Sequence, residues 1–300
     1  MDTLMSHTVA ASAPGFRAAE AQTPDWVEAR DKLVAAQGML GRLPERDLFN
    51  LMRRATVRTV RARKNLFRHG DPAAAVIAVL DGHVKLSTTT VGGREVVLDI
   101  VPPGGCLGEL AVFNNWPRDA DAMTITRSRL LFIDGRQFLQ VMERSAEASQ
   151  AMLRLLSQQL RSARQQVVDV VVLPAPARLA KALLALARLA GPAARDGTRI
   201  APRLSQAELG GMTGLTRESI NKNLAALRDA GWIALEGGSV TLLDVAALDS
   251  LPREHEGRRP GHGRIYPCRG EFFHPPSRRS PFPDVAAAKR AGFGVGQARP

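Results

Sequence analysis

Four polar side chains fall within two turns of one expected helix, which begins after Thr216. Arg217, Glu218, Asn221 and Lys222 occupy its exposed face. An arginine can donate to guanine O6 and N7 together, a glutamate can accept from cytosine N4, and a lysine can reach guanine or a phosphate. The chemistry open to this group is therefore the reading of base edges in the major groove of DNA.

A helix that precedes this group has a clear start in the sequence. Ser205 and Glu208 have the spacing of a capping box, in which each side chain satisfies an otherwise free backbone N–H. Leu209 and Met212 would pack this helix into a core. Gly210 falls where two helices must cross closely, because it carries no side chain to keep them apart.

The connection between the two helices is also predicted by residue type. Gly214 lies where the chain must turn through a left-handed conformation, which glycine adopts at little cost. Thr216 caps the second helix, and Ile220, Leu224 and Leu227 form its buried side. The pair of helices is predicted to be a helix-turn-helix. The candidate DNA-binding residues are Arg217, Glu218, Asn221, Lys222, Ser205 and Thr216.

Two short β-type runs follow the second helix. Ala234–Glu236 and Ser239–Leu242 flank Gly237-Gly238, which predicts a two-stranded wing. The alternative for the whole segment is a helical hairpin that binds protein. A DNA-reading unit is favoured over that alternative, because four features agree with it. They are the helix caps, the glycines at 210 and 214, the Arg217-Glu218 pair and the wing.

Residues 56–134 have a different sequence pattern, in which short apolar runs are separated by glycines. Asp81-Gly82 and Gly92-Gly93 each separate two such runs, and we expect both to close β-hairpins. Many short strands at this spacing predict a sandwich or barrel. The flanking runs are Val76–Leu80 with Val84–Ser87, and Ser87–Thr90 with Glu95–Ile100.

A long helix is expected next, from residue 146 to about residue 173. Its apolar residues alternate spacings of three and four, which is the pattern of a heptad seam and favours pairing with a second copy of the chain. The alternative is a helix that lies on the core of its own domain. Pro174 and Pro176 then interrupt the helical pattern and mark a hinge. The predicted dimer interface consists of Leu153, Leu156, Leu160, Ala163, Val167 and Val170.

Composition limits the class of protein. The chain of 300 residues is 45% hydrophobic and can fill two cores, but it has no apolar run long enough to span a membrane and no secretory signal, so we expect a cytoplasmic location. The net charge of +12 favours a polyanionic partner, although ten basic and four acidic residues lie beyond Ser250. Cys106 and Cys268 are far apart and predict neither a disulfide nor a zinc site. No sequence motif of an enzyme is present, and we expect no enzymatic activity.

With these motifs in place, the sequence resembles the cyclic-AMP receptor protein and fumarate–nitrate regulator (Crp/Fnr) superfamily of bacterial transcription factors, over roughly residues 44–248. One anchor is the stretch T-R-E-S-I-N-K-N-L, and the other is G-C-L-G-E-L-A-V-F-N-N-W-P-R-D-A-D-A, which is similar to the family's phosphate-binding cassette. The resemblance implies an α+β fold with an N-terminal cyclic-nucleotide-binding-type β-roll (jelly roll), a long dimerisation helix and a C-terminal winged helix-turn-helix.

The resemblance also implies an effector site. Gly108, Glu109 and Leu110 would begin a short helix whose N–H groups face a cyclic phosphate, with Glu109 on the ribose hydroxyl and Arg118 on the phosphate. The alternative for Glu109 and Arg118 is an internal ion pair that holds the roll together. Asp119 stands where the family has a Ser or Thr, and its carboxylate would repel the anion or compete for Arg118.

A second departure lies on the long helix. Ala163 and Arg164 stand where the cyclic-AMP-responsive members place hydroxyl residues against the purine. The familiar purine contact is therefore missing, and either another nucleotide binds or none does. The candidate cofactor is a cyclic nucleotide, cAMP or cGMP. The chain lacks the cysteine cluster of the iron–sulfur branch, and His69 and His83 are isolated, so neither an iron–sulfur cluster nor haem is expected.

The expected partners follow from this organisation: double-stranded DNA, a second copy of the chain in a homodimer, and RNA polymerase, with no membrane. The rival function is a cyclic-nucleotide-binding regulatory subunit that acts on a protein, or a regulator that needs no effector. The predicted divisions are a disordered N-terminus (1–24), a sensor domain (25–145), a dimerisation helix (146–173), a winged helix-turn-helix (174–250) and a disordered basic tail (251–300).

Overall fold

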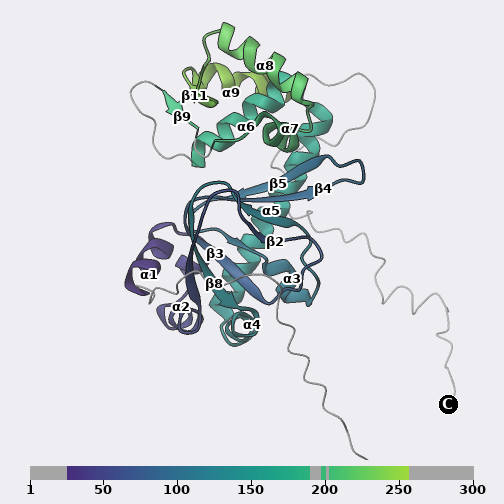
Figure 1. Ribbon diagram of the computed structural model, residues 1–300. Helices are drawn as coiled ribbons and strands as arrows, with labels where there is room; N and C mark the ends of the chain where they lie inside the picture. Colours follow the sequence, from purple (N-terminus) through teal and green to yellow (C-terminus); the bar gives the residue numbers. More distant parts are fainter. Residues whose placement is uncertain (1–25, 190–196, 201–202, 257–300) are drawn as a thin grey trace, which may run out of the picture. The chain divides into compact units, whose positions relative to one another are not determined.

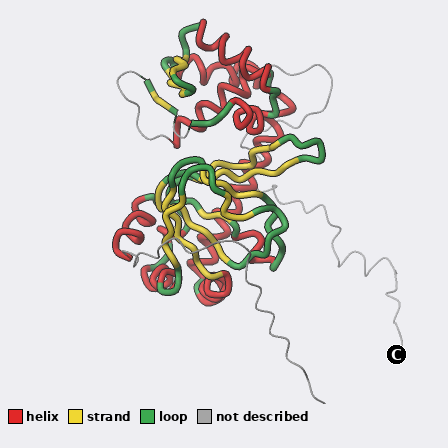
Figure 2. The backbone as a smooth tube through the Cα atoms, in the orientation of Figure 1, coloured by secondary structure: helices red, strands yellow, loops and turns green. Residues whose placement is uncertain are grey.

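The computed structural model describes residues 26–189, 197–200 and 203–256. Within them, a strand-rich segment is followed by one long helix and then by a helix-rich segment (Figures 1 and 2). This is the expected α+β order of β-roll, connecting helix and winged helix-turn-helix. The predictions of disorder for residues 1–24 and for the tail beyond residue 256 lie outside the described residues.

The strands of the roll form two antiparallel four-stranded sheets. One sheet has the order β1-β8-β3-β6 and the other the order β2-β7-β4-β5. Their inner faces share one buried cluster, to which Ile77, Val84 and Leu130 contribute. The strands are β1 (Thr56–Val60), β2 (Asn65–Phe67), β3 (Ala75–Asp81), β4 (Val84–Thr89), β5 (Glu95–Val101), β6 (Cys106–Leu107), β7 (Asp121–Thr124) and β8 (Ser128–Asp134).

Helices cover the outer face of the first sheet. In β3, Val76, Ala78 and Leu80 pack against these helices, while Ile77 and Val79 face the second sheet. Because β3 is buried on both faces, its sequence is a continuous apolar run without alternation. The helices are α1 (Trp26–Ala35), a 3-10 turn η1 (Leu40–Arg42), α2 (Glu45–Met52) and α4 (Gly135–Arg144); α3 (Glu109–Asn114) lies between β6 and β7.

One predicted hairpin is wrong and the other is confirmed. The chain at Asp81-Gly82 joins β3 to β4, but these strands belong to different sheets and do not pair. Gly82 is left-handed, with φ of 82°, and a Cβ there would collide with the backbone at Arg127 and Ser128. The glycine therefore serves a sheet-to-sheet corner at a close backbone approach. β4 and β5 do pair around Gly92-Gly93.

The long helix α5 runs from Ala146 to Val172 and is capped by the Ser145 hydroxyl, which accepts from Ala148 N at 3.2 Å. Its first turns are buried in the core of the roll. At its C-terminal end, Arg178 donates to Val170 O at 3.1 Å, and Lys181 Nζ lies 2.7 Å from Asp169 Oδ1. The last carbonyls of α5 therefore gain a cation at the hinge.

The C-terminal segment forms a second core of leucine and isoleucine side chains, including Leu183, Leu224 and Ile233. A small three-stranded sheet has the order β10-β11-β9. The elements are α6 (Ala175–Leu189), β9 (Thr198–Arg199), α7 (Gln206–Thr213), α8 (Arg217–Asp229), β10 (Ile233–Glu236), β11 (Ser239–Leu242) and α9 (Val245–Glu256).

Helix α9 extends six residues beyond Ser250, where we placed the start of the disordered tail. Leu248, in its first half, is fully buried in the C-terminal core, and the helix contacts α6. Burial of this apolar face stabilises the helix although Pro252 lies inside it.

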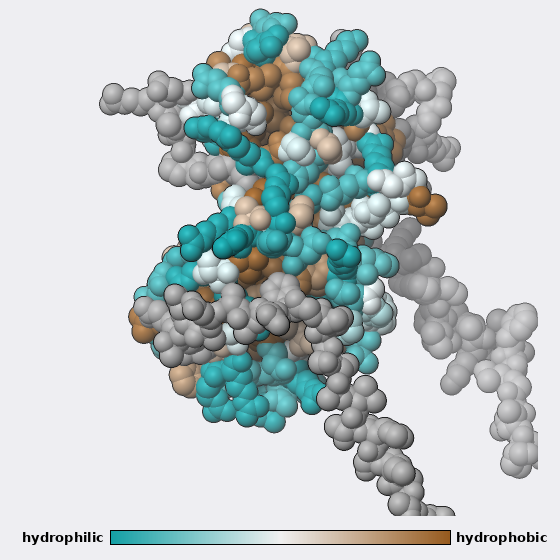
Figure 3. Space-filling model, in the orientation of Figure 1, coloured by the Kyte–Doolittle hydropathy of each residue, from teal (hydrophilic) through white to brown (hydrophobic). Residues whose placement is uncertain are grey.

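On the face drawn in Figure 3, hydrophilic residues cover most of the described surface, and hydrophobic ones show between them in small areas. In the described part of the chain, no helix is both long enough and apolar enough to cross a membrane.

Candidate nucleic-acid interface and effector site

The capping box of α7 is confirmed. Ser205 Oγ accepts from Glu208 N at 3.2 Å, and Glu208 Oε2 accepts from Ser205 N at 2.8 Å. The close crossing at Gly210 is also confirmed, since a Cβ there would lie 2.7 Å from Leu215 O. Gly214 is left-handed, with φ of 70°, as the turn requires. These contacts fix the angle at which α8 leaves the turn.

Helix α8 separates its buried and exposed sides as its sequence predicts. Thr216 Oγ1 accepts from Ser219 N at 3.2 Å and begins the helix. Ile220, Leu224 and Leu227 are buried against the second core. The four candidate base-reading side chains are all exposed and occupy the first two turns: Arg217, Glu218, Asn221 and Lys222.

We call the exposed surface of these four α8 side chains the reading face. It makes few contacts with the rest of the chain among the described residues. Arg217 Nε lies 3.5 Å from Gln206 Oε1, which is at the limit of a hydrogen bond. Ser205 and Thr216 are exposed, but their hydroxyls are engaged as helix caps. In this arrangement the two cap residues position the helices, while the four α8 side chains remain open to a ligand surface.

The predicted wing is confirmed as a two-stranded ribbon. β10 and β11 pair from Ile233↔Leu242 to Glu236↔Ser239, with Gly237 and Gly238 both left-handed at the turn. β9 adds a third strand, which the sequence did not reveal because only two of its residues pair.

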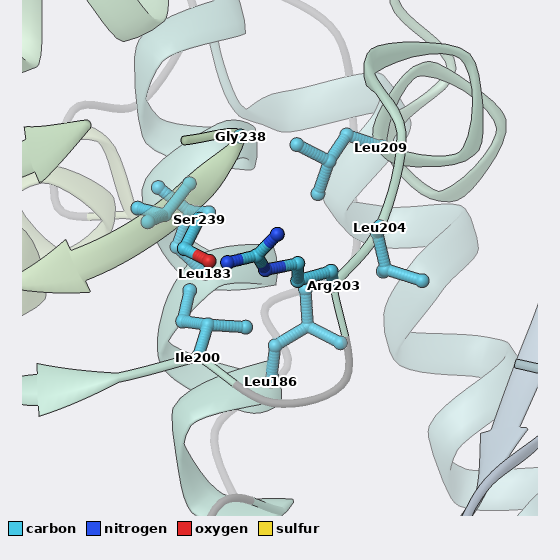
Figure 4. A pocket seen from close by; sticks show the side chains of 9 residues that line it. Leu183, Leu186, Ile200, Arg203, Leu204, Leu209, Gly238 and Ser239 are labelled. Carbon is cyan, nitrogen blue, oxygen red and sulfur yellow. The ribbon is translucent and has the colours of Figure 1, made fainter. Parts of the chain in front are cut away.

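A small cavity lies among α6, α7 and the wing (Figure 4). Arg203 reaches toward Ser239 over Leu183, Leu186 and Ile200. The cavity measures about 10 Å³, which is room for no more than one water molecule. It is therefore a packing defect rather than a place for an effector.

In the roll, Glu109 begins α3 directly after the left-handed Gly108. The Glu109 side chain is buried, its Oε1 accepts from Gln159 Nε2 of α5 at 3.0 Å, and its Oε2 is buried without a partner among the described residues. Burial raises the pKa of Glu109, and the hydrogen bond from Gln159 lowers it by less. This carboxyl group thus has one oxygen free to accept.

Arg118 is also buried and lies beside the start of α3. Its Nη1 donates to Gly108 O at 2.8 Å, its Nη2 donates to Ala75 O at 2.5 Å, and the guanidinium lies 4.3 Å from the centre of the Phe67 ring. Burial lowers the pKa of Arg118. Its Nε has no hydrogen-bond partner among the described residues.

The alternative of a Glu109–Arg118 ion pair is not what the described residues form. Arg118 donates to backbone carbonyls, and Glu109 accepts from Gln159. Asp119 and Leu110 are exposed. Gly108, Glu109 and Arg118 therefore come together at a buried place, whereas Asp119 and Leu110 lie at the surface.

Gln159 is the site residue that sequence reasoning missed as a contact. It lies one helical turn before Ala163, the residue that stands where cyclic-AMP-responsive members place a hydroxyl against the purine. That spacing is the signal that could have identified it. Ala163 and Arg164 are themselves exposed.

The apolar seam of α5 is open along most of its length. Leu153, Leu160, Val167 and Val170 are between 53% and 66% exposed, and Leu156 is partly buried against the core of the roll. The helix therefore packs on its own domain at its start and presents an apolar face beyond it.

The histidine and cysteine side chains that could bind a metal ion or haem are not grouped in the described part of the chain. His69 is exposed, and burial lowers the pKa of the partly buried His83. Cys106 is buried, and burial raises the pKa of its thiol. Cys268 lies outside the described residues. Among described residues, no group of three or more His, Cys, Asp or Glu side chains could hold a metal ion.

Comparisons with known proteins agree with this architecture. The family model for the cyclic nucleotide-binding domain matches residues 57–145, and that for the Crp-like helix-turn-helix domain matches residues 177–251. The chain is 34% identical to the CRP-like cAMP-activated global transcriptional regulator of Mycobacterium tuberculosis, over 61% of this chain and 82% of that protein. It is 29% identical to the cyclic AMP receptor protein of Thermus thermophilus, over 63% of this chain and 84% of that protein.

Solved structures show the same fold. A CRP-family transcriptional regulator from Thermus thermophilus has a TM-score of 0.58 at 26% identity, covering 65% of this chain and 96% of that one. The c-di-GMP-responsive regulator CLP of Xanthomonas campestris has a TM-score of 0.59 at 24% identity, covering 66% and 99%, and supports the fold alone. With its cyclic nucleotide-binding domain and Crp-like helix-turn-helix, the chain belongs to the Crp/Fnr superfamily of bacterial transcription regulators.

Proposed function

We propose that this regulator acts as a homodimer, reads a palindromic TGTGA-like DNA site through α8, and is controlled by a small effector in its roll. The observation that carries the proposal is the exposed face of Arg217, Glu218, Asn221 and Lys222 on a helix that is capped and buried on its other side. A helix held this way can enter a major groove with its first two turns.

The dimer is proposed from α5. Four apolar side chains of the seam are more than half exposed, and a water-exposed seam of this kind is stabilised when a second helix covers it. Two recognition helices about 34 Å apart would then meet successive major grooves of one palindrome. RNA polymerase is the further partner that an activator of this kind would contact.

The roll offers polar groups that fit a cyclic nucleotide. Glu109 Oε2 and Arg118 Nε are buried without partners in the described part of the chain, and a ligand with a hydroxyl and an anion would satisfy both. Glu109 would accept from the ribose hydroxyl, Arg118 would pair with the phosphate, and the N–H groups at Gly108 and Leu110 would face it. The relative from M. tuberculosis carries cAMP in its name, and cAMP and cGMP are the first candidates here.

Titration calorimetry with cAMP, cGMP and cyclic di-GMP separates the possible effectors. Heat with one of them, lost in Glu109→Gln, supports the proposed site. Absence of heat with all three would favour another effector or a regulator that acts without one. Asp119 is the residue against anion binding, and Asp119→Ser should therefore tighten any nucleotide that binds.

DNA reading is tested by substitution on α8. Arg217→Ala should weaken binding to the preferred palindrome by roughly 5- to 150-fold at fixed salt, because a bidentate contact to guanine contributes about 1 to 3 kcal/mol. Fluorescence anisotropy with a labelled duplex measures the change. Arg228→Ala is the matched control, since Arg228 lies in the last turn of α8 and pairs with Asp229.

Two outcomes would contradict this assignment. One is an Arg217→Ala protein that keeps its affinity within a factor of two. The other is binding of the unmodified protein that does not weaken as salt rises, because phosphate contacts release counterions. The second outcome would favour the rival function, a nucleotide-binding regulatory subunit that acts on a protein.

A further inference from the structure

A buried lysine of the roll meets the first helix of the helix-turn-helix at Glu208. Lys85 of β4 is 2% exposed, and its Nζ lies 2.7 Å from Glu95 Oε1 and 3.0 Å from Glu208 Oε1. Arg63, in the loop after β1, also donates to Glu208 Oε1. We call Arg63, Lys85, Glu95 and Glu208 the Glu208 cluster. Three of its members come from the roll, and the fourth is the capping glutamate of α7.

Backbone and apolar contacts surround the Glu208 cluster. Arg94 Nη2 donates to Leu215 O, in the turn of the helix-turn-helix, at 3.0 Å. A Cβ at Gly211 would lie 3.0 Å from both Glu95 O and Val97 Cγ2, so α7 and β5 approach as closely as a missing side chain allows. Val97 belongs to the same buried cluster as α6, α7 and α8. The contact therefore involves the start of α7, its middle and the turn that precedes α8.

The charges of the Glu208 cluster oppose separation of α7 from the roll. A buried ammonium group costs several kcal/mol unless it is paired, and Lys85 has Glu95 and Glu208 as its ion-pair partners among the described residues. Separation of α7 from the roll would remove one partner from Lys85 and two cations from Glu208. Both groups would then have to regain water or another partner, so separation of α7 from the roll is costly unless new contacts replace the lost ones.

The contact leaves the reading face of α8 exposed, but it fixes where that face lies relative to the roll. In the same arrangement, both Nη atoms of Arg118 donate to carbonyls of the roll. A bound phosphate would compete with those carbonyls for the same donors. In the arrangement that includes the Glu208 cluster, both Nη atoms of Arg118 are therefore engaged by the roll, and its Nε is without a partner among the described residues.

We propose that the Glu208 cluster is an ionic latch: its ion pairs hold the helix-turn-helix against the roll and restrain DNA binding until the effector binds Arg118. This inference rests on the proposed function. Because ligand and DNA affinities are linked through one equilibrium, weakening the latch should raise DNA affinity in the absence of effector.

Lys85→Met is the main test. Methionine keeps the length of the side chain and removes the charge, in a site where Glu208 retains Arg63. We expect the Kd for a duplex with the preferred site, without effector, to fall roughly fivefold or more. Lys32→Met is the matched control, since Lys32 pairs with Glu28 and Asp81 inside the roll, and it should stay within twofold. An unchanged or weaker affinity for Lys85→Met overturns the latch.

Gly211→Ala tests the same contact without changing a charge. The added methyl group would press on the Glu95 carbonyl and on Val97, and both the lysine and the glycine variant should shift DNA affinity in the same direction. A shift in opposite directions would show that charge alone, and not separation of α7 from β5, causes the effect of Lys85→Met, which contradicts the proposal.

A double-mutant cycle tests the contact between Lys85 and Glu208 without DNA. Lys85→Met and Glu208→Gln, alone and together, are compared by urea unfolding; the glutamine retains an acceptor for the cap at Ser205 N. We expect the two changes to be coupled by roughly tenfold in the unfolding equilibrium. No coupling overturns the latch. If coupling is present while no duplex binds any of the proteins, the proposed function fails and the regulatory role fails with it, although the contact stands.

Discussion

Two buried glutamates begin helices in this chain, and their surroundings differ. Glu109 begins α3 of the roll, and Glu208 lies in the first turn of α7; each is 3% exposed. Glu208 accepts from Ser205, Lys85 and Arg63. Glu109 accepts from Gln159 and keeps one oxygen without a partner in the described residues. One carboxylate is saturated by the fold, and the other retains capacity for a ligand.

The acid–base behaviour of the two groups follows from this difference. Burial raises the pKa of Glu208, but the hydrogen bonds from Arg63, Ser205 and Lys85 outweigh burial and lower the pKa to about 2. Burial raises the pKa of Glu109, and its single partner does not compensate. A saturated buried charge stabilises a fold, whereas an unsaturated one is retained at a cost and points to function.

The largest expected effect is on folding stability. Glu208→Ala leaves Lys85 with one partner in a buried site and removes the N3 cap of α7, so we expect a loss of about 3 to 5 kcal/mol in the free energy of unfolding. Glu109→Gln removes a poorly satisfied buried charge and should change stability by less than about 1 kcal/mol. Urea unfolding at pH 7 measures both. Similar losses in the two variants would remove the distinction.

The second prediction is that the contributions of Glu208 and Glu109 to folding stability change with pH in opposite directions. The pKa of Glu208 in the folded protein is about 2, below its ordinary 4.5, so its contribution is present above pH 4.5 and is lost as pH falls toward 2. The cluster that sets this behaviour also contains Arg63, Lys85 and Glu95. The raised pKa of Glu109 means that its charge costs stability as pH rises above 4.5.

Differences between variants isolate these contributions from the rest of the chain. The stability of the unmodified protein minus that of Glu208→Gln should shrink as pH falls from 4.5 to 2, on the order of 1 to 3 kcal/mol. The same difference taken with Glu109→Gln should grow as pH falls through the raised pKa of Glu109. Parallel slopes for the two variants would contradict the comparison.

The smallest expected effect concerns the single partner of Glu109. Gln159→Leu removes one hydrogen bond, which contributes about 0.5 to 1.5 kcal/mol, and should raise the pKa of the Glu109 carboxyl further. An NMR titration of that carboxyl group measures the change, with Gln158→Leu as the neighbouring control on α5. A pKa that stays in place would show that the Gln159 contact does not act on Glu109.

The sequence by itself determined the local features of this protein. The capping box at Ser205, the left-handed Gly214, the buried side of α8 and the wing at Gly237-Gly238 each depend on residues within a few positions of one another. Local spacing is sufficient there, because helix caps and tight turns are closed by neighbouring residues. The same holds for the exposed face of α8, since a buried face on one side places the polar residues on the other.

Only the tertiary structure decided which distant residues meet. The Asp81-Gly82 turn has a hairpin sequence, yet it joins two sheets because β3 pairs with β8 and β4 with β5 and β7. Lys85 is 123 residues from Glu208, and Gln159 is 50 residues from Glu109. No local pattern reports such pairs, because a buried charge selects its partner through packing of whole elements. The saturation of one glutamate and the open oxygen of the other are for that reason properties of the fold.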